Sequence, residues 1–202
     1  MMGSDKMKLI LASSSENRRN LFDMVGFDYE VVSSKEKEES TNTNPEEYVK
    51  ELSLIKATSV EKQINEKAII VACDSVIYLK NKIYEKPKTK EEAKNNIKEM
   101  SGKTVHSITG LTVKDLYQDK VITVVDTCNL VFKNISDEEI DWYINNEKTI
   151  YDKCGFAIQG KAAFFIDRVE GDYNTLIGIS LSQLNQCFKE LGYSLSDFKF
   201  KE

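Results

Sequence analysis

Apolar and polar positions change in blocks along the first third of the chain, and the blocks predict alternating strands and helices. Residues 8–12 (KLILA) form an apolar run typical of a buried strand, and residues 16–25 have the spacing of a helix. Residues 27–32 alternate apolar with polar side chains, which predicts a second strand. Residues 45–66 predict a long helix, and residues 68–73 (AIIVAC) predict a strand covered on both faces. The order is therefore β-α-β-α-β.

The rest of the chain is richer in strand patterns and closes with a helix. Residues 105–117 and 121–133 predict a long hairpin around a polar turn, and capping signals predict helices after Thr89 and Ser136. The spacing of residues 181–191 predicts a last amphipathic helix. We predict an α/β (mixed α+β) fold, a two-lobed mixed β-sheet with flanking helices and a central cleft. An immunoglobulin-like sandwich and a helical bundle do not fit this order.

The chain length sets the scale of the fold. Its 202 residues suit one substantial domain or two small lobes, and we expect a single domain over residues 1–202. We expect residues 1–6 to be either an appended segment or disordered. No signal peptide is recognisable, and no apolar run approaches the ~18–20 residues of a membrane span. Four cysteines without a C-x-x-C pair favour reduced thiols and a cytoplasmic location.

Charge narrows the class of ligand. The chain has 28 Lys+Arg against 33 Asp+Glu, a formal net charge of −5, and one histidine. A multi-histidine zinc site is therefore excluded, and nucleic acid is a disfavoured partner because no basic excess exists. A small phosphorylated ligand needs only local positive charge. The arginines are few, namely Arg18, Arg19 and Arg168, and two of them are adjacent.

Those adjacent arginines lie in a segment that predicts an anion site. Ser13-Ser14-Ser15 follows the first strand, and the next helix carries Arg18 in its first turns. Backbone N–H groups at a helix start, serine hydroxyls and a guanidinium together bind phosphate well. Arginine, unlike lysine, offers two parallel donors to one phosphate. The alternative is that a serine caps the helix and the arginines are solvated.

Asp74 is the candidate for acid–base or metal chemistry. It directly follows the predicted buried strand of residues 68–73, and we expect that strand to end at Asp74. The end of such a strand lies at the edge of the sheet where α/β proteins bind their ligands. A carboxylate at that edge can hold Mg²⁺ or activate water, although a turn or capping aspartate is an equal alternative. Lys86 follows in a loop restricted by Pro87, and by itself it is as well explained as a solvated lysine.

Three further features carry weaker signals. The segment SGKT (residues 101–104) resembles the end of a P-loop, but it lacks the upstream glycine and is preceded by a helix rather than a strand, so we reject that reading. His106 has no serine-nucleophile motif to serve and is expected to be structural. Gln159 lies between two glycines, where its amide could read a base edge.

These segments, taken in order, resemble the Maf family of nucleoside triphosphate pyrophosphatases. The ordered set is specific although each segment is weak. Its members are LASSSENRR (residues 11–19), ACDS (72–75), EKP (85–87), SGKT with ITG (101–104 and 108–110), YDKCGFAIQG (151–160) and VEGDYNTLIGISL (169–181). The resemblance implies a Maf and inosine-triphosphatase-like fold with a nucleotide in the cleft, a small-molecule substrate and a homodimer. It also implies hydrolysis of the α–β phosphate bond to a monophosphate and pyrophosphate.

The resemblance also implies residue roles. Asp74 corresponds to the catalytic carboxylate that takes the proton of the attacking water. Glu38, together with Asp74, corresponds to residues at a divalent cation, Mg²⁺ or Mn²⁺. The residues that correspond to the phosphate-binding set are Ser13, Ser15, Arg18, Lys56 and Lys86.

Base recognition is where the chain departs from the family pattern. Members acting on dTTP and UTP usually have Arg at the position of Asn17 and Thr at that of Ser75, whereas Gln159 keeps the pyrimidine-type pattern. We expect dTTP, UTP or modified pyrimidine nucleotides as substrates. The alternatives are a non-catalytic nucleotide-sensing regulator of cell division, and a house-cleaning pyrophosphatase for purines of the ITP or XTP type.

Overall fold

The structure is a computed structural model that describes residues 6–151 and 154–201. Residues 1–5, most of the segment expected to be appended or disordered, lie outside the described residues. So do residues 152–153 of the segment YDKCGFAIQG. No helix in the described ranges is both long and apolar enough to cross a membrane.

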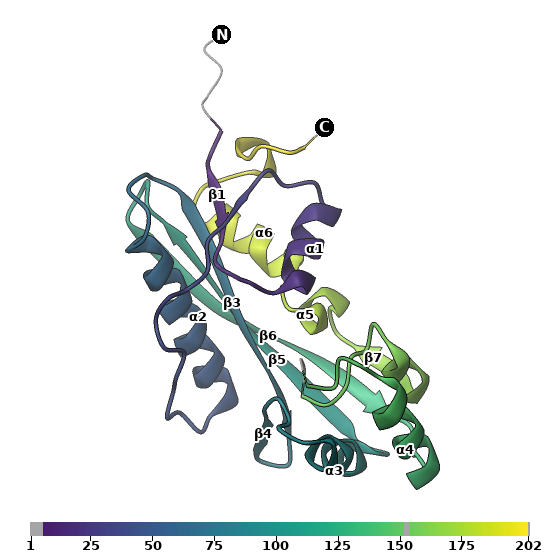
Figure 1. The fold of residues 1–202 in the computed structure, drawn as a ribbon. Coiled ribbons are helices and arrows are strands. Elements are labelled where there is room, and N and C mark those ends of the chain that lie inside the picture. Colours follow the sequence, from purple (N-terminus) through teal and green to yellow (C-terminus); the bar gives the residue numbers. More distant parts are fainter. Residues whose placement is uncertain (1–5, 152–153, 202) are drawn as a thin grey trace. The chain divides into compact units, whose positions relative to one another are not determined.

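Helices and strands largely follow the predicted order (Figure 1). They are β1 (Leu9–Leu11), α1 (Glu16–Met24), β2 (Glu30–Val31), α2 (Pro45–Glu61), β3 (Ile69–Leu79), β4 (Lys82–Tyr84), α3 (Lys90–Met100), β5 (Thr104–Asp115), β6 (Lys120–Phe132), α4 (Asp137–Asn146), β7 (Ile166–Glu170), α5 (Tyr173–Ile177) and α6 (Leu181–Glu190).

The strands form a mixed sheet, as predicted. The hydrogen-bonded order is β2-β1-β3-β5-β6-β7, and β4 pairs with β3 off this path. Strand β1 runs parallel to both β2 and β3, with Ile10 opposite Ile70, whereas β4 and β7 pair antiparallel with β3 and β6. Helices flank the sheet, and the fold class is therefore α/β with a mixed sheet.

The described residues divide into two compact units. The first comprises residues up to Ser75, together with Ile108–Asp126 and the chain from Asn174 onward. The second comprises Val76–Ser107 and Thr127–Tyr173. Strands β3, β5 and β6 contribute residues to both units. The expectation of a single domain over the whole chain stays a prediction.

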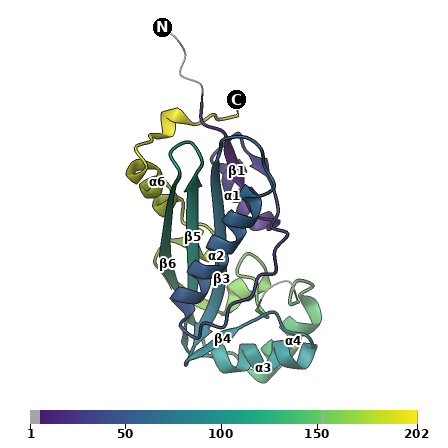
Figure 2. The same ribbon diagram turned by 90° about the vertical axis from the view of Figure 1, so that its left-hand side faces the viewer.

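Helix α2 covers one face of the sheet in the first unit (Figure 2). Asn44 caps its start by accepting from the backbone N–H groups of Glu46 and Glu47. Its buried face packs on β1 and β3, and β5 approaches it so closely that a Cβ on Gly110 would lie 2.4 Å from the carbonyl oxygen of Val49. Only glycine permits this approach, and it fixes the helix against the sheet.

The second unit is held by its own contacts. Helices α3 and α4 are joined by ion pairs from Lys94 to Asp141 (2.5 Å) and from Lys98 to Asp137 (2.8 Å). The predicted capping box at the start of α4 is present, because Ser136 and Glu139 each accept from the other's backbone N–H.

Two predicted elements have different bounds. The strand over residues 27–32 shortens to Glu30–Val31, since Phe27 instead forms a bridge with Phe200 near the C-terminus. The helix predicted to reach residue 66 ends at Glu61, one residue after the last fully buried apolar position, Val60. Local pattern sets neither boundary; tertiary contacts do.

A third difference bears on function. The strand predicted to end at Asp74 continues to Leu79, so Asp74 lies in the middle of β3. The prediction relied on the apolar run ending at residue 73, but tertiary partners of a polar side chain can keep it within a strand. Asp74 is therefore held by the ladder of a paired strand and not by a turn.

Candidate functional site

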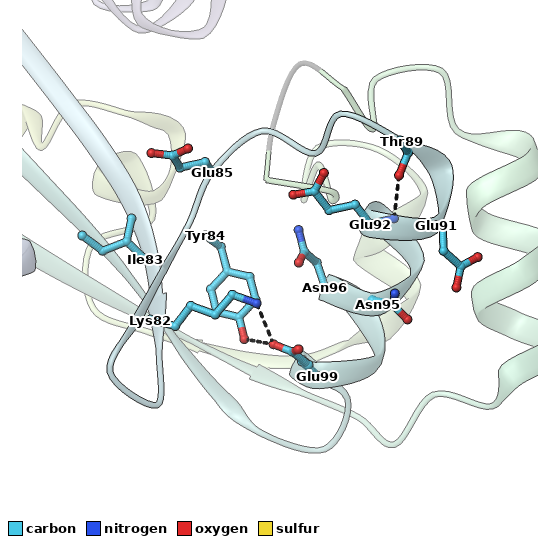
Figure 3. Close-up of a pocket in the computed structure, with 10 residues that line it drawn as sticks. All are labelled: Lys82, Ile83, Tyr84, Glu85, Thr89, Glu91, Glu92, Asn95, Asn96 and Glu99. Carbon is cyan, nitrogen blue, oxygen red and sulfur yellow. Dashed lines mark hydrogen bonds and ion pairs between the residues drawn. The ribbon is translucent and has the colours of Figure 1, made fainter. Parts of the chain in front are cut away.

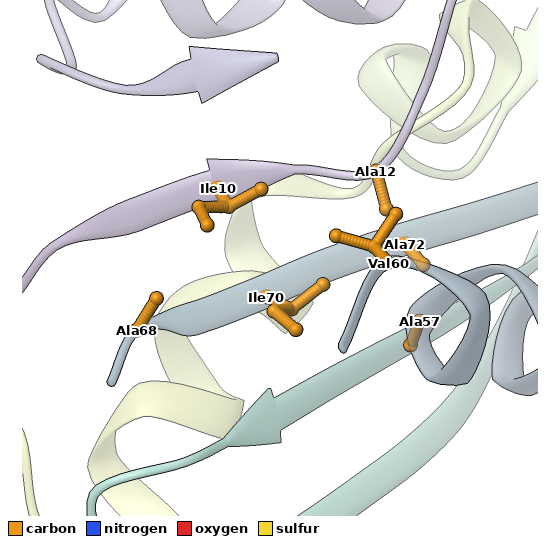
Figure 4. Close-up of a cluster of buried hydrophobic side chains, with 7 residues drawn as sticks. All are labelled: Ile10, Ala12, Ala57, Val60, Ala68, Ile70 and Ala72. Carbon is orange, nitrogen blue, oxygen red and sulfur yellow. The ribbon is translucent and has the colours of Figure 1, made fainter. Parts of the chain in front are cut away.

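The alternation of side chains along β3 determines where the site residues point. Ala68, Ile70 and Ala72 form a buried cluster with Ala57 and Val60 of α2 (Figure 4). Side chains two residues apart on a strand share a face. Asp74 therefore continues the face that meets α2, and Ser75 points to the opposite face. Two neighbouring residues supply two different sets of contacts.

On the α2 face, Lys56 brings the two predicted metal-binding carboxylates together. Its ammonium nitrogen lies 2.6 Å from Asp74 Oδ1, 3.1 Å from Glu38 Oε2 and 3.5 Å from the carbonyl oxygen of Cys73. The side chains of Lys56 and Asp74 are 10% and 13% exposed, whereas that of Glu38, in the loop before α2, is 42% exposed. We call these three residues the carboxylate cluster.

The carboxylate cluster has a net formal charge of −1 and spare oxygen atoms. A lysine ammonium has three donors, and the three contacts above use them all. Asp74 Oδ2 and Glu38 Oε1 form no ion pair with any residue in the described part of the chain. Carboxylate oxygens are the ligands that Mg²⁺ and Mn²⁺ prefer, so Asp74 and Glu38 fit a divalent cation. Lys56 contacts both carboxylates in the structure, and its expected role at the phosphates stays a prediction.

On the opposite face, Arg18 is held by three acceptors. Its Nε donates to the carbonyl oxygen of Gly178 at 3.1 Å, Nη1 to Ser13 Oγ at 3.4 Å and Nη2 to Ser75 Oγ at 3.1 Å. Ser13 is buried, Arg18 is half-buried and Ser75 is exposed. No carboxylate pairs with Arg18 in the described ranges, so its positive charge is available to an anion. The structure thus brings Ser13 and Arg18 together, and their role as an anion site stays a prediction.

The start of α1 holds the other two predicted residues of this segment. Ser15 is the N-cap residue, but its hydroxyl makes no capping hydrogen bond, and its backbone N–H donates to Ser13 Oγ at 3.2 Å. Asn17 lies half-buried in the first turn. That Ser15 and Asn17 contact the substrate stays a prediction.

Two threonines extend the arginine cluster and were not predicted from the sequence. Thr109 Oγ1 lies 2.8 Å from Ser75 Oγ and donates to the carbonyl oxygen of Thr175 at 3.1 Å. Thr109 is part of the ITG segment, which the resemblance singled out without a role. No pattern in the sequence separates Thr109 from the other buried polar residues of this strand, such as Ser107 and Thr112.

Lys86 and Gln159 belong to the second unit. Lys86 is exposed, between exposed Glu85 and buried Pro87, and Gln159 is exposed in a turn. Their roles at the phosphates and the base stay predictions.

A cavity of about 580 Å³ in the second unit is not suited to phosphate (Figure 3). Its lining includes four glutamates against one lysine, Lys82, whose ammonium is paired with Glu99 at 3.1 Å. The Tyr84 hydroxyl also donates to Glu99, and these two bonds hold the pKa of that carboxyl below its usual value. The cavity wall is therefore anionic, and a triphosphate would be repelled.

The comparisons with known proteins agree with the ordered segments. A family model described as Maf-like protein matches residues 8–191. The chain belongs to the Maf family. Its relatives include a protein named dTTP/UTP pyrophosphatase of Thermoanaerobacter sp. (strain X514), which is 37% identical over 185 residues, 91% of this chain and 96% of the relative. A second, of Clostridium novyi (strain NT) with the same name, is 36% identical over 193 residues, 94% of this chain and 100% of the relative.

A solved structure, a HAM1 protein from Coxiella burnetii, matches with a TM-score of 0.42 and 11% identity over 62% of this chain and 73% of that one. The fold class of this Maf-family chain therefore rests on its own strand order and not on this match.

The remaining candidates in the Maf-family chain are structural. Burial raises the pKa of the Cys73 thiol to about 11, so this neighbour of Asp74 stays protonated and is no nucleophile. His106 Nδ1 lies 2.7 Å from Asn129 Oδ1 within the sheet. Gly102 of the SGKT segment has a φ of +67° after α3, as expected of a turn and not of a P-loop.

Proposed function

We propose that this chain is a nucleoside triphosphate pyrophosphatase that hydrolyses the α–β phosphate bond and acts on dTTP, UTP or modified pyrimidine nucleotides. The observation that carries the proposal is the pair of clusters at two successive residues of β3: Asp74 supplies a carboxylate, and Ser75 accepts from the guanidinium of Arg18, which has no carboxylate partner among the described residues. The relatives named dTTP/UTP pyrophosphatase support the same reaction and substrate class.

The phosphate chain would be bound by the arginine side of the site. A triphosphate carries close to four negative charges, and hydroxide attack requires that these be screened. Arg18 supplies the charge and Ser13 a hydroxyl, and Ser15, Lys56 and Lys86 are the further predicted contacts. Each donor that meets the leaving pyrophosphate stabilises the charge that develops there.

Asp74 would act as the general base. A water proton passes to the Asp74 carboxylate, the water oxygen bonds to the α phosphorus, and the bond from this phosphorus to the bridging oxygen breaks. The electron pair leaves with pyrophosphate, and no covalent intermediate is required. Lys56 holds Asp74 Oδ1 in place, which directs the other oxygen of the carboxylate to the water.

Glu38 and Asp74 are the residues that would hold Mg²⁺ or Mn²⁺. Such a cation would neutralise phosphate charge and polarise the phosphoryl oxygens. From the resemblance we also expect a homodimer that binds a small nucleotide, and from the cysteines, the charge and the hydropathy a cytoplasmic protein with no nucleic-acid or membrane partner. The cation, the homodimer, the location and the partners are all part of this proposal.

A panel of triphosphates tests the function. The protein is incubated with dTTP, UTP, dCTP, ITP, XTP and modified pyrimidine triphosphates and either Mg²⁺ or Mn²⁺, and pyrophosphate and monophosphate are measured. We expect stoichiometric release of both from pyrimidine substrates. Release from ITP or XTP alone would favour the purine house-cleaning alternative, and tight binding without any release would favour the nucleotide sensor.

The variant Asp74→Asn tests the mechanism. Asparagine keeps the shape and can still accept from Lys56, but it cannot take a proton, so we expect kcat to fall by roughly 10²–10⁴-fold. Binding of a non-hydrolysable α,β-methylene analogue should be largely retained. Full activity in this variant would exclude Asp74 as the base.

A further inference from the structure

The hydrogen bonds around Arg18 close into a ring. Arg18 donates to Ser75 Oγ, Ser75 contacts Thr109 Oγ1, and Thr109 donates to the carbonyl oxygen of Thr175. The same carbonyl accepts from the backbone N–H of Gly178 at 3.1 Å, and the carbonyl of Gly178 accepts from Arg18 Nε. We call these five residues the Arg18 ring.

The donors in the Arg18 ring have one consistent direction. A hydroxyl has a single hydrogen. Thr109 gives its hydrogen to Thr175, so in the contact between Thr109 and Ser75 the serine must be the donor. Ser75 is then left with lone pairs alone, and it accepts from Arg18. While the ring is intact, Ser75 cannot donate to a phosphate oxygen.

Counting N–H groups in the same way shows which donors of Arg18 remain for a ligand. A guanidinium has five N–H groups, and the bonds to Gly178, Ser13 and Ser75 use three. One N–H on each terminal nitrogen has no acceptor among the described residues. Two parallel N–H groups are the arrangement that binds phosphate in bidentate fashion.

The ring is anchored in the core at one end and exposed at the other. Thr109 is 2% exposed and Thr175 is fully buried, and the hydroxyl of Thr175 donates to Asp126 at 2.5 Å. Gly178 has a φ of +131°, and a Cβ there would lie 3.1 Å from Arg18 Nε. Glycine is therefore required both by the backbone and by the approach of the guanidinium.

We propose that Thr109 and Gly178 are positioning residues, which aim the two remaining N–H groups of Arg18 at the phosphates. This gives a role to the ITG and TLIGIS segments, and it rests on the proposed function only in naming a triphosphate as the ligand. Without the Thr109 hydroxyl, Ser75 is free to rotate, and one of the three bonds that fix the guanidinium loses its support.

The test compares Thr109→Val with Thr112→Val. Thr112 is on the same strand and fully buried, and its hydroxyl bonds Ser53 at 2.8 Å and Thr123 at 2.9 Å without contact to the Arg18 ring. Each variant replaces one buried hydroxyl by a methyl group, so both should lower Tm by roughly 2–4 °C. Thr109→Ser keeps the hydroxyl and should behave as wild type.

Two measurements separate positioning from stability. We expect Thr109→Val alone to raise KM for the nucleotide and Kd for inorganic triphosphate by about tenfold, with kcat changed less. In ¹⁵N spectra, which contain Nε–H signals from just three arginines, the Arg18 signal should exchange with solvent faster in Thr109→Val and be unchanged in Thr112→Val.

Equal behaviour of the two valine variants in both measurements would overturn the proposal, as would failure of Thr109→Ser to restore wild-type values. If the wild-type protein hydrolyses no triphosphate, the proposed function fails by itself. The arginine spectra and the binding of inorganic triphosphate still decide the role of Thr109, because neither needs turnover.

Discussion

The carboxylate cluster and the Arg18 ring start from neighbouring residues of β3, yet their chemistry is opposite. Asp74 meets an ammonium and a second carboxylate, and the group has a formal charge of −1. Ser75 meets the guanidinium of Arg18 and the neutral hydroxyl of Thr109, and the five residues of the Arg18 ring have a formal charge of +1. The first suits a cation and a water molecule, and the second suits phosphate.

The difference shows how one strand can divide a reaction between two surfaces. The pleat separates the side chains of Asp74 and Ser75 while keeping their backbones one residue apart. Charges of opposite sign thus flank one strand, and each has its own supporting contacts. Substitutions on the two sides should therefore have different effects, namely a loss of stability at the carboxylate cluster and weaker substrate binding at Arg18.

The largest effect on stability is expected on the carboxylate side, for Lys56→Met. Methionine has a similar length but no charge, so two facing carboxylates lose their shared partner. Because Lys56 and Asp74 are nearly buried, we expect the free energy of unfolding in urea to fall by about 3 kcal/mol. The matched control is Lys62→Met, because Lys62 forms an exposed pair with Glu36 and its loss should cost less than about 0.5 kcal/mol.

Lys56→Met also tests whether Asp74 and Glu38 bind a divalent cation. With the ammonium removed, a divalent cation between Asp74 and Glu38 would replace the lost charge, so Mg²⁺ should stabilise Lys56→Met more than it stabilises the wild type. Equal stabilisation of both proteins by Mg²⁺ would count against a cation site at these two carboxylates.

The next largest effect is a rise in KM, which we expect for Arg18→Lys in the Arg18 ring. Lysine keeps the charge, but its single nitrogen cannot replace the three bonds of the guanidinium together with two donors for phosphate. We expect KM to rise at least about tenfold, a loss of ~1.4 kcal/mol in binding. Arg19→Lys, at the exposed neighbour, should leave KM within about twofold. Similar KM values for the two variants would mean that Arg18 does not bind the phosphates.

The smallest effect is expected for Asn17→Arg, which introduces the residue that the resemblance implies for members acting on dTTP and UTP. One added hydrogen bond from the new side chain would change the ratio of kcat/KM for dTTP and UTP over other substrates by about 2- to 10-fold. The ratio is measured in competition assays, with Asn17→Lys as the control for charge. An unchanged ratio would show that position 17 does not read the base in this chain.

Much of the fold was predictable because local signals and tertiary contacts agree. The helix α3 has the predicted bounds, and Thr89 accepts from the backbone N–H of Glu92. A complete capping box would also have the Glu92 side chain accept from the backbone N–H of Thr89. This part of the prediction is wrong, because the Glu92 carboxylate accepts from the backbone N–H of Lys88 instead. The break expected at Asp74 does not occur, because β3 stays in the sheet beside β5 and its last residues pair with β4, the next strand along the chain.

The site was predictable in its members but not in its contacts. The resemblance named Lys56, Asp74 and Glu38, and the structure brings them together, but the ion pairs from Lys56 to both carboxylates were not predicted. Thr109 and Gly178 were missed as site residues, since their contribution is a hydroxyl direction and a carbonyl position that no spacing encodes.

The alternation of β3 also limits how this segment can evolve. One residue inserted or deleted between Ile70 and Asp74 would reverse the two faces, presenting the carboxylate to Arg18 and the hydroxyl to Lys56. The new ion pair would remove the free guanidinium, and the cation site would lose a ligand. Variation here can therefore proceed by substitution, while a change in length would exchange the two halves of the reaction.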